Sequence, residues 1–135
     1  MIFARMCLFA AMSLVAGYFV TGDLNSAFSS DPVIKVSGIL NMWADYGAAI
    51  IGAYLALYFT KEQFELSLRI GDFNRVIVFV ALLIAPALAV GTYSKAMSNV
   101  GNYVECQAER QVSSRYSSRT YALTDSQCQT VDPIK

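Results

Sequence analysis

The sequence alternates long apolar blocks with short polar segments, and three of the blocks are long enough to cross a membrane. They cover about residues 2–20, 37–59 and 76–93. At a rise of about 1.5 Å per residue, a helix of about 20 residues crosses the roughly 30 Å hydrocarbon core of a bilayer. The pattern therefore predicts a domain of three transmembrane helices over residues 1–93, with the lipid bilayer as its surroundings.

The segments between the blocks have the composition of connectors. Residues 21–35 are rich in Gly, Ser, Asn and Asp and include Pro32, which is typical of a loop. Residues 60–74 carry charges of both signs and predict a short connector at the membrane surface. Pro86 lies in the middle of the third block and removes a backbone donor, so we expect a bend near Ala85.

Residues 94–135 form a polar tail that holds two of the three cysteines, Cys106 and Cys128. The tail is too short and too polar to build an apolar core of its own. A disulfide between these cysteines would close a loop of about twenty residues and stabilise the folded tail by about 3 kcal/mol. Such a bond requires an oxidising compartment. The expected fold is an all-α membrane protein with three transmembrane helices and a short disulfide-closed tail.

The positively charged residues give an independent indication of orientation. Lys61, Arg69 and Arg75 lie between the second and third blocks, whereas only Lys35 lies between the first and second. Because cytoplasmic loops are enriched in Lys and Arg, we expect the N-terminus in the cytoplasm and the tail in the periplasm of a bacterium. The predicted location is the inner membrane.

The first block has a second interpretation, a cleaved signal peptide. Arg5 would be its charged region, residues 6–15 its apolar region and Ala16-Gly17 its cleavage zone. Apolar character continues to Val20 without a clear cleavage motif, which favours a transmembrane helix. Both interpretations stay open at this point.

Composition and charge exclude several classes of function. Lys and Arg together number 10, and Asp and Glu together also number 10, so the formal net charge is zero. The chain therefore has no net positive charge that would attract nucleic acid. It contains no histidine, which excludes a Ser-His-Asp triad and removes the commonest metal ligand. We predict no catalytic residues, no metal and no cofactor, and thus a protein that is not an enzyme.

An intramembrane polar pair, Asn41 and Asp45, stands out in the second block, because a carboxylate within a membrane span is costly. The pair shares a helix face with small residues that permit close helix packing, and the first block has a matching stripe with Ser13 as a hydrogen-bond donor. These helix-packing residues are Ala48, Gly52 and Ala56 in the second block and Ala10, Ser13 and Gly17 in the first. We expect Asp45 to bond to a neighbouring helix or to reach interfacial water; partner recognition and ion or proton handling are the alternatives.

The tail also contains residue types that are favoured at binding hot spots. The candidate partner-binding residues are Arg115, Arg119, Tyr116 and Tyr121. The alternative interpretation is a solvated loop without a binding role. The third cysteine, Cys7, lies in the first block and is expected to remain reduced.

The tail reads Gly101-Asn102-Tyr103-Val104-Glu105-Cys106, then Ser118-Arg119-Thr120-Tyr121, then Cys128. In this pattern and in its overall layout, the chain resembles small uncharacterised inner-membrane proteins of enteric bacteria that have three apolar spans and a two-cysteine periplasmic tail. The resemblance implies the same layout and assigns no activity.

These observations predict a non-enzymatic protein that acts by binding another protein. We favour an immunity-type protein that protects its cell from a membrane-active or periplasmic toxin, because such a protein need only be small, membrane-embedded and complementary to its partner. The alternatives are an accessory subunit of a membrane complex that docks through Ala48 and Gly52, and a small transporter or ion-conducting oligomer that uses Asp45. Whether the chain forms a homo-oligomer stays open.

Overall fold

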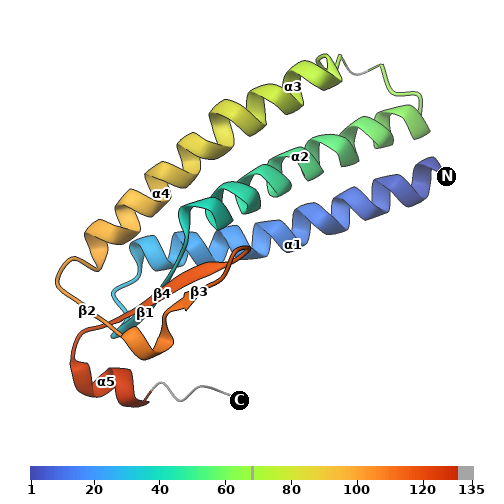
Figure 1. The fold of residues 1–135 in the computed structure, drawn as a ribbon. Helices are drawn as coiled ribbons and strands as arrows, with labels where there is room; N and C mark the ends of the chain where they lie inside the picture. The colour runs from blue at the N-terminus through green and yellow to red at the C-terminus, as the bar shows by residue number, and fades with distance from the viewer. Residues whose placement is uncertain (68, 131–135) are drawn as a thin grey trace. The chain divides into compact units, whose positions relative to one another are not determined.

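The computed structural model describes residues 1–67 and 69–130, and most of them are helical (Figure 1). The helices are α1 (Ile2–Phe28), α2 (Ile39–Gln63), α3 (Phe73–Phe79), the π-helical turn η1 (Val80–Ile84), α4 (Ala85–Asn99), the 3-10 turn η2 (Gln107–Glu109) and α5 (Asp125–Thr130). The strands are β1 (Val33–Ser37), β2 (Val104–Glu105), β3 (Gln111–Val112) and β4 (Ser117–Ala122).

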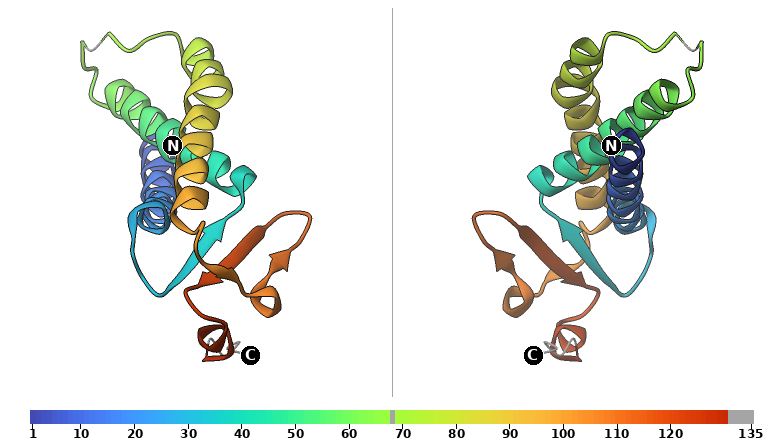
Figure 2. Two further views of the ribbon diagram at one scale, coloured as in Figure 1. Left: turned by 90° about the vertical axis from the view of Figure 1, so that its left-hand side faces the viewer. Right: turned by 90° about the vertical axis from the view of Figure 1, so that its right-hand side faces the viewer.

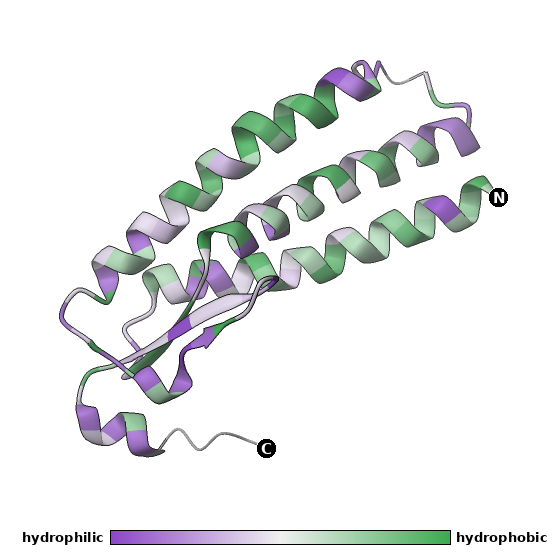
Figure 3. Cartoon of the chain, viewed as in Figure 1, coloured by the Kyte–Doolittle hydropathy of each residue, from purple (hydrophilic) through white to green (hydrophobic). Residues whose placement is uncertain are grey.

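Two helical stretches are long and apolar enough to cross a membrane. One is α1, and the other is the continuous helix Phe73–Asn99 that α3, η1 and α4 form together. Apolar residues dominate both stretches in Figure 3, most strongly in α3 and η1. The helix of the second block, α2, has 25 residues but is not one of these two, and the polar residues Asn41 and Asp45 lie in its first half.

The prediction of an all-α fold was wrong, because the chain contains a four-stranded sheet. Its order is β1-β4-β2, and β3 also pairs with β4 (Figure 2). All pairs are antiparallel, with Val33 opposite Ala122 and Glu105 opposite Tyr121. The β-branched residues Val33, Ile34 and Val36 favour an extended strand in a segment that we expected to be a loop leading into a helix.

The described chain divides into two compact units, and each of them combines separate stretches of sequence. The helical unit consists of Met1–Val20 and Trp43–Leu88, and the sheet unit consists of Thr21–Met42 and the chain from Ala89 onward. The expected division was 1–93 and 94–135. The difference arises because β1, in the first connector, supplies a strand to the sheet of the tail.

Contacts between α1 and α2 hold the helical unit together. The Ser13 hydroxyl donates a hydrogen bond to the Ala49 carbonyl at 2.8 Å. A Cβ added at Gly52 would lie 3.1 Å from the Ser13 Cβ, so the glycine permits this close approach. The rings of Phe9 and Phe59 stack with their centroids 5.6 Å apart.

The sequence predicts a bend near Ala85, and the structure has the π-helical turn η1 directly before this residue. In this turn the Ala85 N–H bonds to the Val80 carbonyl, five residues earlier. The next donor in this pattern would be residue 86, but proline has no N–H. The Ala81 carbonyl instead accepts a hydrogen bond of 2.9 Å from the Trp43 indole of α2. A side chain thus replaces the backbone donor that Pro86 lacks.

In the sheet unit, Gly38 forms the junction between β1 and α2. Its N–H donates to the Ser117 carbonyl at 2.8 Å, and its own carbonyl accepts from the Met42 N–H at 3.1 Å. A Cβ at position 38 would overlap the Ser117 side chain. The same Ser117 carbonyl accepts a bond of 3.2 Å from the Asn41 side chain, so the start of α2 is fixed to β4 by two donors.

Candidate functional site

The predicted disulfide between Cys106 and Cys128 is confirmed. The two Cα atoms are 5.4 Å apart, and the residues are separated by 22 positions in sequence. Cys106 is buried, and its N–H donates to the Thr120 carbonyl at 2.9 Å. The bond therefore ties α5, which contains Cys128, to the segment that pairs with β4. Cys7 is an exposed free cysteine on α1.

Two of the four candidate partner-binding residues, Arg115 and Tyr116, lie exposed in the turn between β3 and β4. Ser113 closes this turn: its N–H donates to the Tyr116 carbonyl at 2.8 Å, and its hydroxyl accepts from the Tyr116 N–H at 3.0 Å. The Lys35 ammonium of β1 lies 5.9 Å from the centre of the Tyr116 ring. The turn is thus an ordered surface that presents one arginine and one tyrosine.

Tyr121, the third candidate, is buried, with 6% of its surface exposed. Its hydroxyl contacts the Met97 sulfur of α4 at 3.8 Å. A side chain in this position packs inside the sheet unit and cannot serve as a surface hot spot. The sequence could not reveal this, because β4 is buried along most of its length and its residues do not alternate between apolar and polar.

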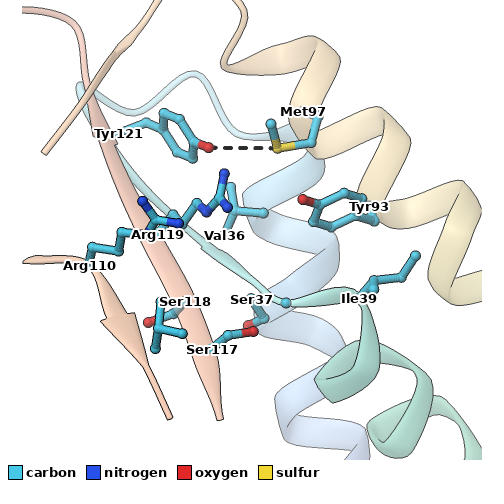
Figure 4. A pocket seen from close by; sticks show the side chains of 12 residues that line it. Val36, Ser37, Ile39, Tyr93, Met97, Arg110, Ser117, Ser118, Arg119 and Tyr121 are labelled. Carbon is cyan, nitrogen blue, oxygen red and sulfur yellow. Dashed lines mark hydrogen bonds between the residues drawn. The ribbon is translucent and has the colours of Figure 1, made fainter. Parts of the chain in front are cut away.

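Arg119, the fourth candidate, lines a pocket of about 220 Å³ that lies wholly within the sheet unit (Figure 4). We call it the arginine pocket. Its walls are formed by β1 and the start of α2, by the last turns of α4, and by the β3 and β4 region: Val36–Ile39, Tyr93, Met97, Arg110, Val112, Ser117–Arg119 and Tyr121. In Figure 4, Arg110 and Arg119 reach into the same space, opposite Tyr93 and Met97 of α4.

One carboxylate faces both arginines of this pocket. The Nε atoms of Arg110 and Arg119 lie 4.0 Å and 3.9 Å from the Glu105 Oε1 atom. That oxygen accepts no hydrogen bond from the described residues, so both ion pairs are long and weak. A hydrogen bond with Tyr121, together with the charge of Glu105, raises the pKa of the Arg119 guanidinium above its usual value. Two guanidinium groups against one carboxylate leave a net charge of one positive unit.

The structure gives the two residues of the intramembrane polar pair different surroundings. Asn41 bonds to the Ser117 carbonyl, within the sheet unit. Asp45 is half-buried in the helical unit and lines a shallow groove. The other residues that line the groove are all apolar: Leu8, Ala11, Met12, Val15, Ala16, Phe19 and Ala48. The Asn41 contact is part of the sheet architecture, and Asp45 borders an apolar surface.

The predicted helix-packing residues are brought together only in part. Ser13 and Gly52 meet, whereas a Cβ added at Gly17 would meet no atom within 4 Å. Ala16 is buried instead, so the packed face of α1 passes through Ser13 and Ala16 rather than through Gly17. Three further residues of the stripes are half-buried: Ala10, Ala48 and Ala56.

Sequence reasoning missed Arg110, Tyr93 and Met97 as members of a site. Tyr93 and Met97 are four residues apart on α4 and therefore share a helix face, a spacing visible in the sequence. Arg110 carries no comparable signal, because its position depends on the pairing of β3 with β4. Among residues 1–67 and 69–130, no group of three or more Cys, Asp or Glu side chains could hold a metal ion.

Comparisons with models of protein families, with curated proteins and with solved structures find no match for this chain.

Proposed function

We infer that the chain is an inner-membrane protein with three crossings, whose sheet unit lies in the periplasm and binds another protein. The sheet itself supports the number of crossings. β1 and β4 are hydrogen-bonded neighbours and must lie on the same side of a membrane. Between them the chain contains α2 and the apolar helix Phe73–Asn99. If that helix crosses once, α2 must cross as well, so that the chain returns to the side of β1.

Exposed apolar surface supports membrane insertion. Large apolar side chains on α1, including Leu8, Leu14 and Phe19, are more than half exposed, as are Leu82 and Leu83 in η1. Soluble monomers rarely expose apolar patches of this extent, whereas a lipid environment covers them. The contacts of Phe9 with Phe59 and of Ser13 with Ala49 favour an α1 that is retained rather than cleaved.

The charges and the disulfide together support the proposed orientation. Lys61, Arg69 and Arg75 lie on the connector between α2 and α3, which the positive-inside rule assigns to the cytoplasm. The opposite side then carries the sheet unit with its disulfide, in a compartment that allows the bond to form.

One observation carries the binding function: the ordered turn that presents Arg115 and Tyr116 on a disulfide-tied sheet. Arg and Tyr are enriched at binding hot spots, and a preorganised surface loses little entropy on association. Within this class we favour an immunity-type protein that recognises a membrane-active or periplasmic toxin.

The two alternative functions receive less support. Docking of an accessory subunit through Ala48 and Gly52 would compete with α1, because Ser13 already lies against Gly52. A transport pathway through Asp45 would need further polar groups, and the other residues that line its groove are apolar.

Single cysteines in a Cys7→Ser background test the topology in intact cells. Ser30→Cys, just before β1, should react with a membrane-impermeant maleimide, whereas Glu65→Cys should react only after lysis. Labelling of Glu65→Cys in intact cells, or protection of Ser30→Cys, contradicts the proposed orientation.

Competition between strains tests the function. A deletion strain should grow normally alone and lose viability beside a neighbour that carries the matching toxin. Arg115→Ala or Tyr116→Ala should weaken toxin binding by about 1–2 kcal/mol without lowering the amount of protein in the membrane. Gln107→Ala, an exposed change in η2, is the matched control. Poor growth of the deletion strain alone, with recovery of a housekeeping complex on purification, would support an accessory subunit instead.

A further inference from the structure

Within residues 1–67 and 69–130, the arginine pocket holds more hydrogen-bond donors than the protein uses. Each guanidinium has five N–H donors, whereas a carboxylate has only about four acceptor sites. The Glu105 Oε1 atom that both arginines approach accepts no hydrogen bond from the described residues. The arginine side chains are 46% and 43% exposed, so a ligand can reach them.

The shape and lining of the pocket restrict the ligand. Its volume of about 220 Å³ is below the roughly 300–1,000 Å³ of sites for drug-sized molecules, so it suits a small group. The Tyr93 and Ser117 side chains add hydroxyl groups, and Val36 and Met97 add apolar walls. Two arginines on one small site are typical of phosphate recognition, because the planar guanidinium donates two parallel bonds to an oxyanion.

The position of Tyr93 and Met97 on their helix indicates the source of the phosphate. The helix Phe73–Asn99 has 27 residues and is therefore about 40 Å long, close to the thickness of a bilayer that includes its headgroup layers. Met97 is two residues from the end of this helix, and Tyr93 is six. If the helix spans the membrane, its last turns lie at the depth of the lipid headgroups.

We propose that the arginine pocket binds a phosphate group, supplied by the headgroup of an anionic phospholipid, through Arg110 and Arg119. This proposal rests on the membrane insertion inferred above. The apolar walls favour a lipid over free phosphate, because inorganic phosphate has no carbon atoms to cover Val36 and Met97. The bound headgroup would fix the sheet unit against the surface of the membrane.

Native mass spectrometry of the full chain in neutral detergent, with phosphatidylglycerol added, tests the proposal. The wild-type protein should retain one phosphatidylglycerol molecule, and Arg110→Gln or Arg119→Gln should lower the affinity by roughly tenfold or more, the factor for one lost charge-assisted hydrogen bond. Arg69→Gln, at an exposed arginine outside the pocket, is the matched control and should bind as the wild type does. An intact Cys106–Cys128 bond, checked by alkylation without reductant, shows that each variant has folded.

A second arm uses inorganic phosphate. If free phosphate alone raises the unfolding temperature through Arg110 and Arg119, and no lipid is retained, the phosphate site stands and the lipid source is wrong. If neither probe binds in a way that depends on these arginines, the proposal is overturned. Alkaline carbonate extraction distinguishes failure of the phosphate proposal from failure of membrane insertion, because release of the protein by carbonate contradicts the insertion itself.

Discussion

The helical unit and the sheet unit are stabilised by different means. In the helical unit, small residues and stacked rings hold helices whose outer surfaces remain apolar and exposed, as at Ser13 with Gly52 and at Phe9 with Phe59. In the sheet unit, a disulfide and backbone hydrogen bonds connect segments with many polar residues. Lipid can complete the first unit, whereas the second must satisfy its polar groups internally or with water. Substitutions should therefore affect the two units separately.

Removal of the disulfide should have the largest effect and should be confined to the sheet unit. In the chain-entropy model, Cys128→Ser costs about 3 kcal/mol for a loop of this size. The tail should become sensitive to protease, while the fluorescence of Trp43, the single tryptophan and a residue of the helical unit, should stay unchanged. Cys7→Ser is the control and should leave both readouts as in the wild type. A change of Trp43 fluorescence in Cys128→Ser would show that the units are not separable.

Gly52→Leu should damage the helical unit and leave the sheet unit intact. The new side chain must displace Ser13, because even a Cβ at this position lies 3.1 Å from the Ser13 Cβ. Overpacking of this kind costs about 1–3 kcal/mol. Thermal unfolding in detergent, followed by Trp43 fluorescence, measures the loss. Gly17→Leu makes the same change on α1 in open space, and an equal loss there would contradict the described packing.

Trp43→Phe should remove the indole donor to the Ala81 carbonyl while keeping an aromatic ring. The expected cost is about 1 kcal/mol, the usual net value of one hydrogen bond. The Pro86→Ala variant restores a backbone N–H in this region, so Trp43→Phe should cost less in that background. A double-mutant cycle, followed by helical circular dichroism, measures the coupling. Additive effects would show that the indole does not substitute for the missing donor.

Asp45→Asn should have the smallest effect, within about 0.5 kcal/mol, because the amide keeps the size of the carboxylate and one of its two acceptor oxygens. Protection against the toxin and the amount of protein in the membrane should both be unchanged. An inactive Asp45→Asn protein at normal abundance would favour a transport function that depends on an ionisable group.

The sequence was sufficient to predict features that depend on local composition. Two apolar helices long enough to cross a membrane and the Cys106–Cys128 bond follow from length, residue type and spacing. β1 could not be recognised in the same way, because its five residues follow Pro32 in a polar segment and their partner strand lies about 80 residues further along the chain.

The surroundings of the candidate partner-binding residues were predictable only where the side chains stay at the surface. Arg115 and Tyr116 lie in a turn and are exposed, as a hot-spot pattern requires. Tyr121 is a tyrosine like Tyr116, but it lies in β4, the central strand of the sheet, and its side chain is buried. The pocket could not be anticipated, because Arg110 and Arg119 converge on Glu105 only after the strands have paired.

The strand order has a consequence for the synthesis of the protein. Val33 of β1 pairs with Ala122 of β4, 89 residues later in the chain. At about 5–20 residues per second, the ribosome needs roughly 4–18 s to produce the partner of β1 after β1 itself has been made. During this interval Ile34 and Val36 lack the neighbour that buries them, and the strand presents unpaired backbone groups on both sides. Until β4 has been synthesised, β1 is therefore an unpaired strand that can pair with another chain.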